Sequence, residues 1–291
     1  MNEEIYSYYR DAGEIASSIL QRGAGEIRRE ASYRDVVEHI EDLVAASGAG
    51  LAFPLNVSIN AAAAHDTASS NEERLFRDGD VVKLDLGVHI EGYIADCATT
   101  VDLGKNDLLL DASKEALRHA ILLARSGVAT GDLGAAIQKE IEERGYRPIA
   151  NLGGHGLDRF VIHKPPNIPN IGMAGGAVLE EGMIIAIEPF ASTGSGFVSE
   201  QRKTEIYSQT ISKPVRLPQA RRVLEEIRPR RGLPFARRWL HEKKLDIVLP
   251  NLVKTGLLHP YPVLADIPGS LVSQHEHTLI ITDDEPIVTT R

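Results

Sequence analysis

One acidic residue lies inside each arm of a predicted β-hairpin, and this feature constrains the fold more than any other. The first arm, Val81–Val88, is apolar or alternates apolar and polar residues. The second arm, Tyr93–Val101, is aromatic and β-branched, as strands prefer. Asp85 and Asp96 lie within these arms among apolar or small neighbours. Burying a carboxylate in such a place is costly, so the hairpin needs a reason to hold two of them.

The length of the hairpin loop decides how the two aspartates face each other. A loop of His89–Gly92 places Asp85 opposite Asp96, whereas a loop of only Glu91–Gly92 makes them diagonal neighbours. In both cases the carboxylates meet on one face and repel each other. Three arrangements are physically sensible: one aspartate is protonated, a cation lies between them, or the face is exposed and both are solvated.

Composition limits the class of protein. The chain has 291 residues, 43% hydrophobic and 25% charged, as expected for a soluble globular protein of one large or two small domains. The net charge of −9 argues against wholesale nucleic-acid binding, so we expect no specific nucleic-acid partner. The single cysteine, Cys97, cannot form an internal disulfide, which fits a reducing cytoplasm. The N-terminal segment is acidic and polar rather than a signal peptide, and no apolar run approaches the ~20 residues that cross a bilayer.

Apolar residues at helical spacing predict amphipathic helices that cover a sheet. The second of these segments has a capping start at Ser32, and the last is expected to be capped by Thr130 or Asp132 and to end at Gly145. The predicted helices are Glu3–Arg22, Ser32–Ala46, Asp111–Ser126 and Leu133–Arg144.

Two histidines follow a pair of glycines that allow close approach of the backbone. His155 comes directly after Gly153 and Gly154, and His163 is eight positions further on. An even separation in an extended segment places both side chains on the same side. We expect Pro165–Pro169, which follows, to be a loop.

Two glutamates lie in segments that predict strands of the main sheet. Glu188 lies in the apolar segment Met183–Phe190, and Glu276 lies between two histidines in Gly269–Thr282. Alone, each glutamate has an ordinary explanation as a hydrogen-bond acceptor, and a lone His155 is most often a satisfied core or surface residue. Together with the hairpin aspartates they form a mostly carboxylate set, which suits a pair of divalent first-row ions.

An arginine-rich segment, Pro214–Lys244, interrupts the strands and carries helical apolar spacing. We therefore expect an inserted helical subdomain at 208–262, between a first catalytic part at 1–207 and the final strands at 263–291.

Several motifs, in order, resemble the type II methionine aminopeptidases of the pita-bread metallopeptidase family. They are FPLNVSINAAAAH (53–65), KLDLGVHIEGYIADCATTV, GGHG followed by IH at 162–163, AIEPF and QHEHT. The resemblance spans nearly the whole chain and implies an α/β (α+β) fold with a pseudo-symmetric curved antiparallel sheet covered by helices. The insert resembles the winged-helix-like insert of type II, and the lack of a long charged N-terminal extension resembles the archaeal form.

The resemblance also implies a site. Family metal ligands map onto Asp85, Asp96, His155, Glu188 and Glu276, which would hold two divalent ions of Co, Mn, Fe or Zn. The resemblance implies that His65 and His163 contact the scissile amide. It also implies that Glu188 transfers a proton to the leaving amine. A methionine side-chain pocket maps onto Phe53, Ile162 and Tyr261, although any one of these also suits plain core packing. His275 departs from the family, which has Phe there; on a strand it is expected to point away from Glu276.

The implied function is metal-dependent removal of the initiator methionine from peptides and nascent chains by a cytoplasmic monomer. The enzymatic alternative is a proline-directed relative, prolidase or aminopeptidase P. Those enzymes carry a large N-terminal domain before the catalytic part, and His65 comes too early in this chain for such a domain to precede it. A non-catalytic binding relative is a second alternative, although such relatives have lost ligands that this chain retains. A third possibility is that the arginine-rich segment associates with the ribosome. The acidic residues of the segment dilute its positive charge, so a solvated helical face is favoured instead.

Overall fold

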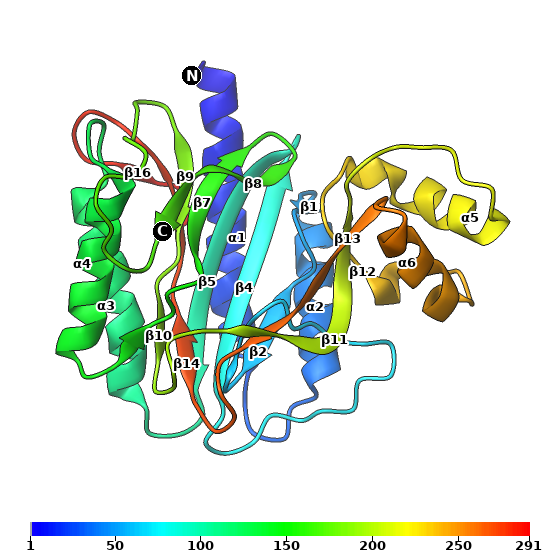
Figure 1. Ribbon diagram of the computed structural model, residues 1–291, viewed down its shortest axis with the longest axis horizontal. Coiled ribbons are helices and arrows are strands. Elements are labelled where there is room, and N and C mark those ends of the chain that lie inside the picture. The colour runs from blue at the N-terminus through cyan, green and yellow to red at the C-terminus, as the bar shows by residue number, and fades with distance from the viewer. Residues whose placement is uncertain (1) are drawn as a thin grey trace.

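Curved antiparallel sheets form the centre of the protein, with long helices on one side (Figure 1). The computed structural model describes residues 2–291. Its α-helices are α1 (Glu3–Ala24), α2 (Tyr33–Ala46), α3 (Asp107–Leu123), α4 (Thr130–Glu143), α5 (Pro218–Ile227) and α6 (Leu245–Lys254), with 3₁₀ turns η1 (Arg228–Arg230) and η2 (Arg237–Trp239). Its strands are β1 (Gly50–Leu51), β2 (Asn56–Ile59), β3 (Ala62–Ala64), β4 (Val81–Ile90), β5 (Tyr93–Asp102), β6 (Arg147–Pro148), β7 (Gly153–Asp158), β8 (Val161–Pro169), β9 (Ile184–Ile187), β10 (Phe190–Ser192), β11 (Ser199–Gln209), β12 (Phe235–Ala236), β13 (Leu258–Ala265), β14 (Val272–Gln274), β15 (His277–Ile280) and β16 (Ile287–Val288).

The predicted hairpin is β4–β5, and it turns through only two residues. Glu91 and Gly92 both have positive φ, 51° and 89°, as a tight two-residue hairpin turn requires. The register pairs Asp85 with Ala98 and Gly87 with Asp96. The aspartates are therefore diagonal neighbours, and the shorter of the two loop alternatives is confirmed.

Strand alternation sends the apolar residues of the hairpin to the helices and both acids to the opposite face. Leu84 and Leu86 flank Asp85, Cys97 follows Asp96, and these three apolar residues are buried in the core beneath α1 and α2. The face that carries Asp85 and Asp96 is thus set by core packing.

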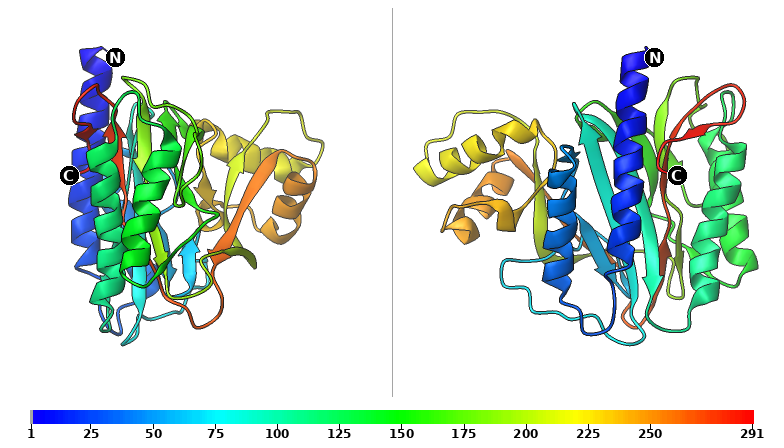
Figure 2. Two further views of the ribbon diagram at one scale, coloured as in Figure 1. Left: turned by 60° about the vertical axis from the view of Figure 1, so that its left-hand side comes forward. Right: turned by 180° about the vertical axis from the view of Figure 1, so that it is seen from behind.

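The second half of the molecule repeats the arrangement with α3 and α4 on the five-stranded order β16-β15-β9-β7-β8. Figure 2 (right) shows the helices of both halves on the same side. The halves join where β5 meets the β14–β15 segment: Glu276 N donates to Ala98 O at 3.0 Å, and Asp96 N donates to the Thr278 hydroxyl at 2.7 Å. The seam between the halves therefore runs through two of the candidate ligands.

The predicted helices are confirmed, with shifts at their ends. α1 continues through Gly23 to Ala24, and α3 begins four residues before the expected Asp111. Ser32 caps α2 as expected, whereas the residue at the N-cap of α4 is Ala129.

The prediction of a loop at Pro165–Pro169 is wrong, because these residues belong to β8. β8 is the edge of its sheet and pairs only with β7, as in the pair Gly154 with Ile168. Prolines are found on edge strands and at bulges, and Pro165 and Pro166 lie in the register shift between Lys164 and Asn167, where neither has a partner on β7.

The arginine-rich segment and the residues after it up to Lys254 fold as α5, η1, β12, η2 and α6, an insert between the paired strands β11 and β13 (Figure 1). Its apolar residues form a separate cluster that includes Val223 and Leu252. It contacts the body of the protein through Glu41, which accepts from the Arg238 guanidinium and, at 3.0 Å, from Trp239 Nε1. The two strands continue across the limits expected for the insert, and the division at 208 and 262 remains a prediction.

Arg238→Ala is expected to lower the free energy of unfolding by about 3 kcal/mol, because it leaves the Glu41 carboxylate buried without its cation. The two side chains are only 5% and 10% exposed. The matched control is Arg237→Ala, whose partner Asp246 is 82% exposed, and which should change stability by less than about 1 kcal/mol. The free energy of unfolding of both variants is measured by urea denaturation. Equal losses in the two variants would mean that the buried pair does not anchor the insert.

Among residues 2–291, no helix combines the length and apolarity needed to span a bilayer.

Candidate metal centre and substrate pocket

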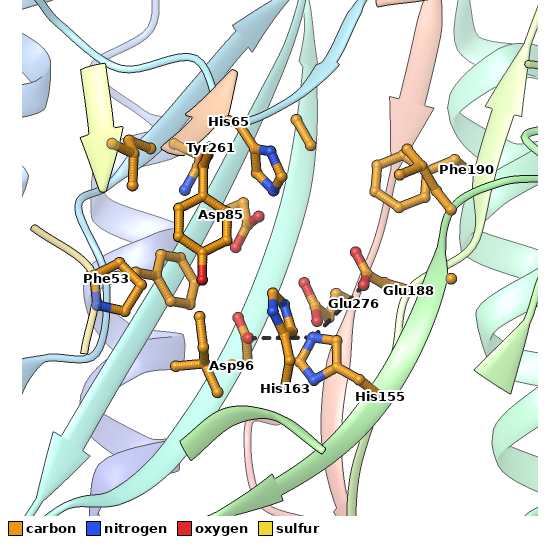
Figure 3. Close-up of a pocket in the computed structure, with 17 residues that line it drawn as sticks. Phe53, His65, Asp85, Asp96, His155, His163, Glu188, Phe190, Tyr261 and Glu276 are labelled. Carbon is orange, nitrogen blue, oxygen red and sulfur yellow. Dashed lines mark ion pairs between the residues drawn. The ribbon is translucent and has the colours of Figure 1, made fainter. Parts of the chain in front are cut away.

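All five predicted ligands line one cavity of about 200 Å³ (Figure 3). Asp85 lies on β4, Asp96 on β5 and His155 on β7. Glu188 and Glu276 lie between strands, after β9 and after β14 respectively. The structure thus brings together residues that are up to 191 positions apart in the chain.

The expectation that the two glutamates lie inside strands is wrong, and the error has a physical cause. β9 and β15 pair in one sheet, whereas β10 and β14 pair in another. Glu188 and Glu276 occupy the break at which each segment passes from one sheet to the next. Pro189, which lacks an N–H, marks the first break. Both breaks aim a carboxylate into the cavity.

The ligand atoms converge. One donor atom each from Asp96, His155 and Glu276 lies within 4.8 Å of the others, and all three residues are buried. His155 Nε2 is 3.9 Å from Asp96 Oδ2 and 3.7 Å from Glu188 Oε1, as the dashed lines in Figure 3 mark. Gln274 Nε2 donates to Glu188 Oε2 at 3.2 Å and to Glu276 Oε2 at 3.5 Å.

Burial makes this cluster hold protons when no cation is present. Burial raises the pKa of Asp85 to about 7. Burial and then the neighbouring Asp85 charge raise the pKa of Asp96, and burial with neighbouring carboxylates raises the pKa values of Glu188 and Glu276. By contrast, burial lowers the pKa of His155 to about 3, so this imidazole is neutral and free to act as a ligand at neutral pH.

The cluster fits a divalent metal on its own chemistry. Asp85 Oδ1, Asp96 Oδ1 and Glu276 Oε1 are buried and have no hydrogen-bond partner in the described part of the chain. Unpaired buried carboxylate oxygens of this kind are costly, and a hard or borderline cation satisfies them.

Metal binding is expected to add more stability near pH 7 than near pH 5. The folded pKa of Asp85, about 7, lies above its ordinary 3.8, so the metal-free fold loses stability as pH rises from about 4 to about 7. A divalent ion binds the deprotonated cluster and removes this loss. The measurement is the rise in Tm on saturation with Mn(II), taken at several pH values. Protonation of the non-ligand histidines destabilises the fold at low pH, but it does so equally in the metal-free and the metal-loaded protein, so it cancels in the difference in Tm. A rise in Tm that does not depend on pH would contradict the prediction.

His65 and His163 lie on either side of the ligands. His163 is exposed on β8, and its ring is 4.3 Å from that of His155, centroid to centroid. The expectation that one extended segment aligns these two histidines is wrong, because β7 and β8 are separate strands of a hairpin that turns after Asp158. His65, with φ of 64°, places Nδ1 3.2 Å from Pro262 O, and burial lowers its pKa to about 4.

The apolar side of the cavity contains the three residues expected there. Phe53 is buried, Ile162 is half-buried, and Tyr261 stacks edge-on against His65 with a centroid distance of 5.4 Å. Further lining residues were not foreseen from the sequence: Asn56, Leu152, Phe190, Ile206 and Pro234. Gln274, which donates to Glu188 and Glu276, was not foreseen either. For Gln274 a signal existed, since it precedes Glu276 by two positions and strand alternation favours the same side.

His275 faces away from the cavity, as expected. Its Nδ1 lies 2.8 Å from the Ser113 hydroxyl of α3, on the helical side of the sheet. The departure from Phe therefore leaves the ligand cluster untouched.

Comparisons with known proteins show the family of this chain. The sequence matches metallopeptidase family M24 over residues 7–283. It is 46% identical over 292 residues to a methionine aminopeptidase of Archaeoglobus fulgidus, with 100% of both chains covered.

Solved structures give the same fold. A methionine aminopeptidase from Thermotoga maritima aligns with a TM-score of 0.74 at 23% identity, covering 100% of this chain and 98% of that one. A thermophilic Arx1 aligns with a TM-score of 0.87 at 18% identity, covering 99% of this chain and 91% of that one. The expected pita-bread fold and the resemblance to archaeal methionine aminopeptidases are confirmed. On the match along most of its length, the chain belongs to metallopeptidase family M24.

Proposed function

We propose that this protein is a metal-dependent methionine aminopeptidase that removes the N-terminal methionine of peptides and nascent chains. The observation that carries the proposal is the set of unpartnered carboxylate oxygens in a cavity whose other walls are two neutral histidines and an apolar surface. The similarity to the Archaeoglobus fulgidus enzyme supports the choice of substrate.

Asp85, Asp96, His155, Glu188 and Glu276 would hold two divalent ions of Co, Mn, Fe or Zn. When bound, the ions supply Lewis acidity that polarises an amide carbonyl and makes water acidic enough to react near neutral pH.

Glu188 is the residue we propose for proton transfer. Its side chain lies at the mouth of the cluster, half-buried, while Asp96, His155 and Glu276 lie deeper. As a carboxylate beside the proposed ions it can take a proton from attacking water and deliver it to the leaving amine nitrogen.

The tautomer of His65 follows from its partner. The carbonyl of Pro262 can only accept, so Nδ1 of His65 carries the proton and Nε2 is left as an acceptor. We propose that Nε2 accepts from the N–H of the scissile amide and so fixes its orientation. His163, which has no hydrogen-bond partner among the described residues, is free to donate to the oxyanion that develops on the carbonyl.

Phe53, Ile162 and Tyr261 are proposed to surround the methionine side chain. A thioether gains dispersion and sulfur–aromatic contact against Phe53 and Tyr261. Methionine is flexible enough to fill an irregular apolar space of this kind.

The remaining proposals concern the chain as a whole. We propose a cytoplasmic monomer with an insert at 208–262 that contributes Pro234 to the cavity wall. The insert's arginines favour a structural role over ribosome binding, because Arg222 pairs with Glu242 at 2.6 Å and Arg237 with Asp246 at 2.6 Å.

The test is hydrolysis of Met-Gly-Met-Met by purified protein supplied with Co(II) or Mn(II). We expect release of free methionine and no cleavage of X-Pro peptides. The opposite preference would support a proline-directed enzyme, and metal binding without hydrolysis of either would support a non-catalytic relative.

A further inference from the structure

A second cavity, of about 600 Å³, lies on the helical side of the sheet, directly behind the segment that carries Glu276. Its walls are α1 and α3, and its floor is β5 with the β14–β15 segment. Figure 2 (right) shows the C-terminal end of the chain between these two helices. We call this cavity the rear groove; the side chains that define its chemistry are Lys114, Glu115, Arg118, His275, His277 and Arg291.

The rear groove is cationic on a chain whose net charge is −9. Lys114 and Arg118 line it, and Glu115 is the one carboxylate side chain among its described lining residues. Glu115 already pairs with Arg118, with Nε to Oε2 at 2.8 Å. Lys114 has no ion-pair partner in the part of the chain that the structure describes. The groove therefore carries excess positive charge.

Two imidazoles on the floor are held in fixed orientations. His275 Nδ1 lies 2.8 Å from the Ser113 hydroxyl, and His277 Nδ1 lies 2.8 Å from the buried Thr290 hydroxyl. Neither Nε2 atom has a partner within residues 2–291. The Thr290 hydroxyl accepts from Thr278 N–H, so its own proton is available to His277 Nδ1, and His277 Nε2 is then a donor available to a ligand. The Ser113 hydroxyl instead donates to Leu110 O or to the Ser273 hydroxyl, so a donor Nε2 is assigned to His277 alone.

We propose that the rear groove binds a phosphate group. A guanidinium, an ammonium and an imidazole N–H donor around one space are a set that recognises a tetrahedral oxyanion. A metal does not suit the groove, because its charged groups are mainly cations and its one carboxylate is paired. The volume exceeds what a single phosphate needs, so the phosphate can belong to free inorganic phosphate or to a nucleotide.

The site is distinct from the metal centre, although the two share the extended segment from β14 to β15. Glu276 lines the metal centre, whereas His275 and His277 on either side of it line the rear groove. The proposal does not depend on the peptidase activity.

Isothermal titration calorimetry of the metal-loaded full chain at constant ionic strength tests the proposal, with inorganic phosphate and AMP as separate ligands. The groove variant is Lys114→Ala/Arg118→Ala. The matched control is Lys105→Ala/Arg125→Ala, which removes the same charge from two exposed residues outside the groove. Lys114→Arg keeps the charge and should keep binding.

We expect phosphate binding to weaken by about tenfold or more in the groove variant and by less than about twofold in the control. Tighter binding of AMP than of phosphate would identify a nucleotide as the source, and equal binding would identify free phosphate. Three results would overturn the proposal: equal affinity in groove and control variants, binding that disappears with Asp96→Asn because the anion sits at the metal centre, or no heat with either ligand. Unchanged circular dichroism of both double variants shows that each is folded.

Discussion

Glu188→Gln is expected to lower kcat/KM on the order of 10³-fold and to reduce bound metal, while the metal-free protein becomes more stable than wild type. The loss follows because the variant removes both a ligand and the proposed proton carrier. The gain in stability follows because the carboxylates repel one another: the Asp85 and Asp96 charges raise the pKa of Glu188 after burial does. A neutral amide of the same shape removes that repulsion.

Peptide hydrolysis, elemental analysis and thermal unfolding with chelator measure the three effects. The matched control is Glu181→Gln, an exposed carboxylate at the turn before β9, which should leave all three near wild type. If the Glu188→Gln protein kept its metal and its activity, Glu188 would be neither a metal ligand nor the proton carrier.

His163→Ala is expected to lower kcat by about 10²-fold or more while metal content stays unchanged. His163 is near the ligands, with its ring centroid 4.3 Å from that of His155, but it lies outside the group of donor atoms that converge. The variant should therefore lose stabilisation of the oxyanion and keep the ligand set.

His163→Asn, which retains an N–H donor, should recover part of the lost kcat. The control is His241→Ala on the insert, whose side chain is 92% exposed and which should behave as wild type. Loss of metal from His163→Ala would show that this histidine is a ligand, and no effect on kcat would remove it from catalysis.

Local pattern was enough to predict where the acids of the hairpin point. Period-2 alternation placed Asp85 and Asp96 on one face under both loop lengths, and the two-residue turn at Glu91–Gly92 then set the diagonal register. Core packing of Leu84 and Leu86 against the helices explains why this face is held firmly.

Long-range pairing was beyond the reach of the same pattern. Glu188 lies in an apolar run typical of a buried strand, and Glu276 lies in a segment predicted to be a strand. Each occupies a switch between two sheets, which depends on partners that are remote in sequence. The even spacing of His155 and His163 predicted that both side chains lie on the same side of one extended segment, whereas the structure brings the two rings together through a hairpin. Docking of the insert through Glu41 and Arg238, 197 positions apart, has no local signal at all.

The central claim is that five residues from remote parts of the chain hold a pair of divalent ions in one cavity. Crystals of protein loaded with Mn(II), with anomalous scattering recorded at the manganese edge, test it most directly. We predict two peaks, both bordered by Asp85, Asp96, His155, Glu188 and Glu276. Peaks located elsewhere, or a cavity without any peak in fully loaded protein, would contradict the account.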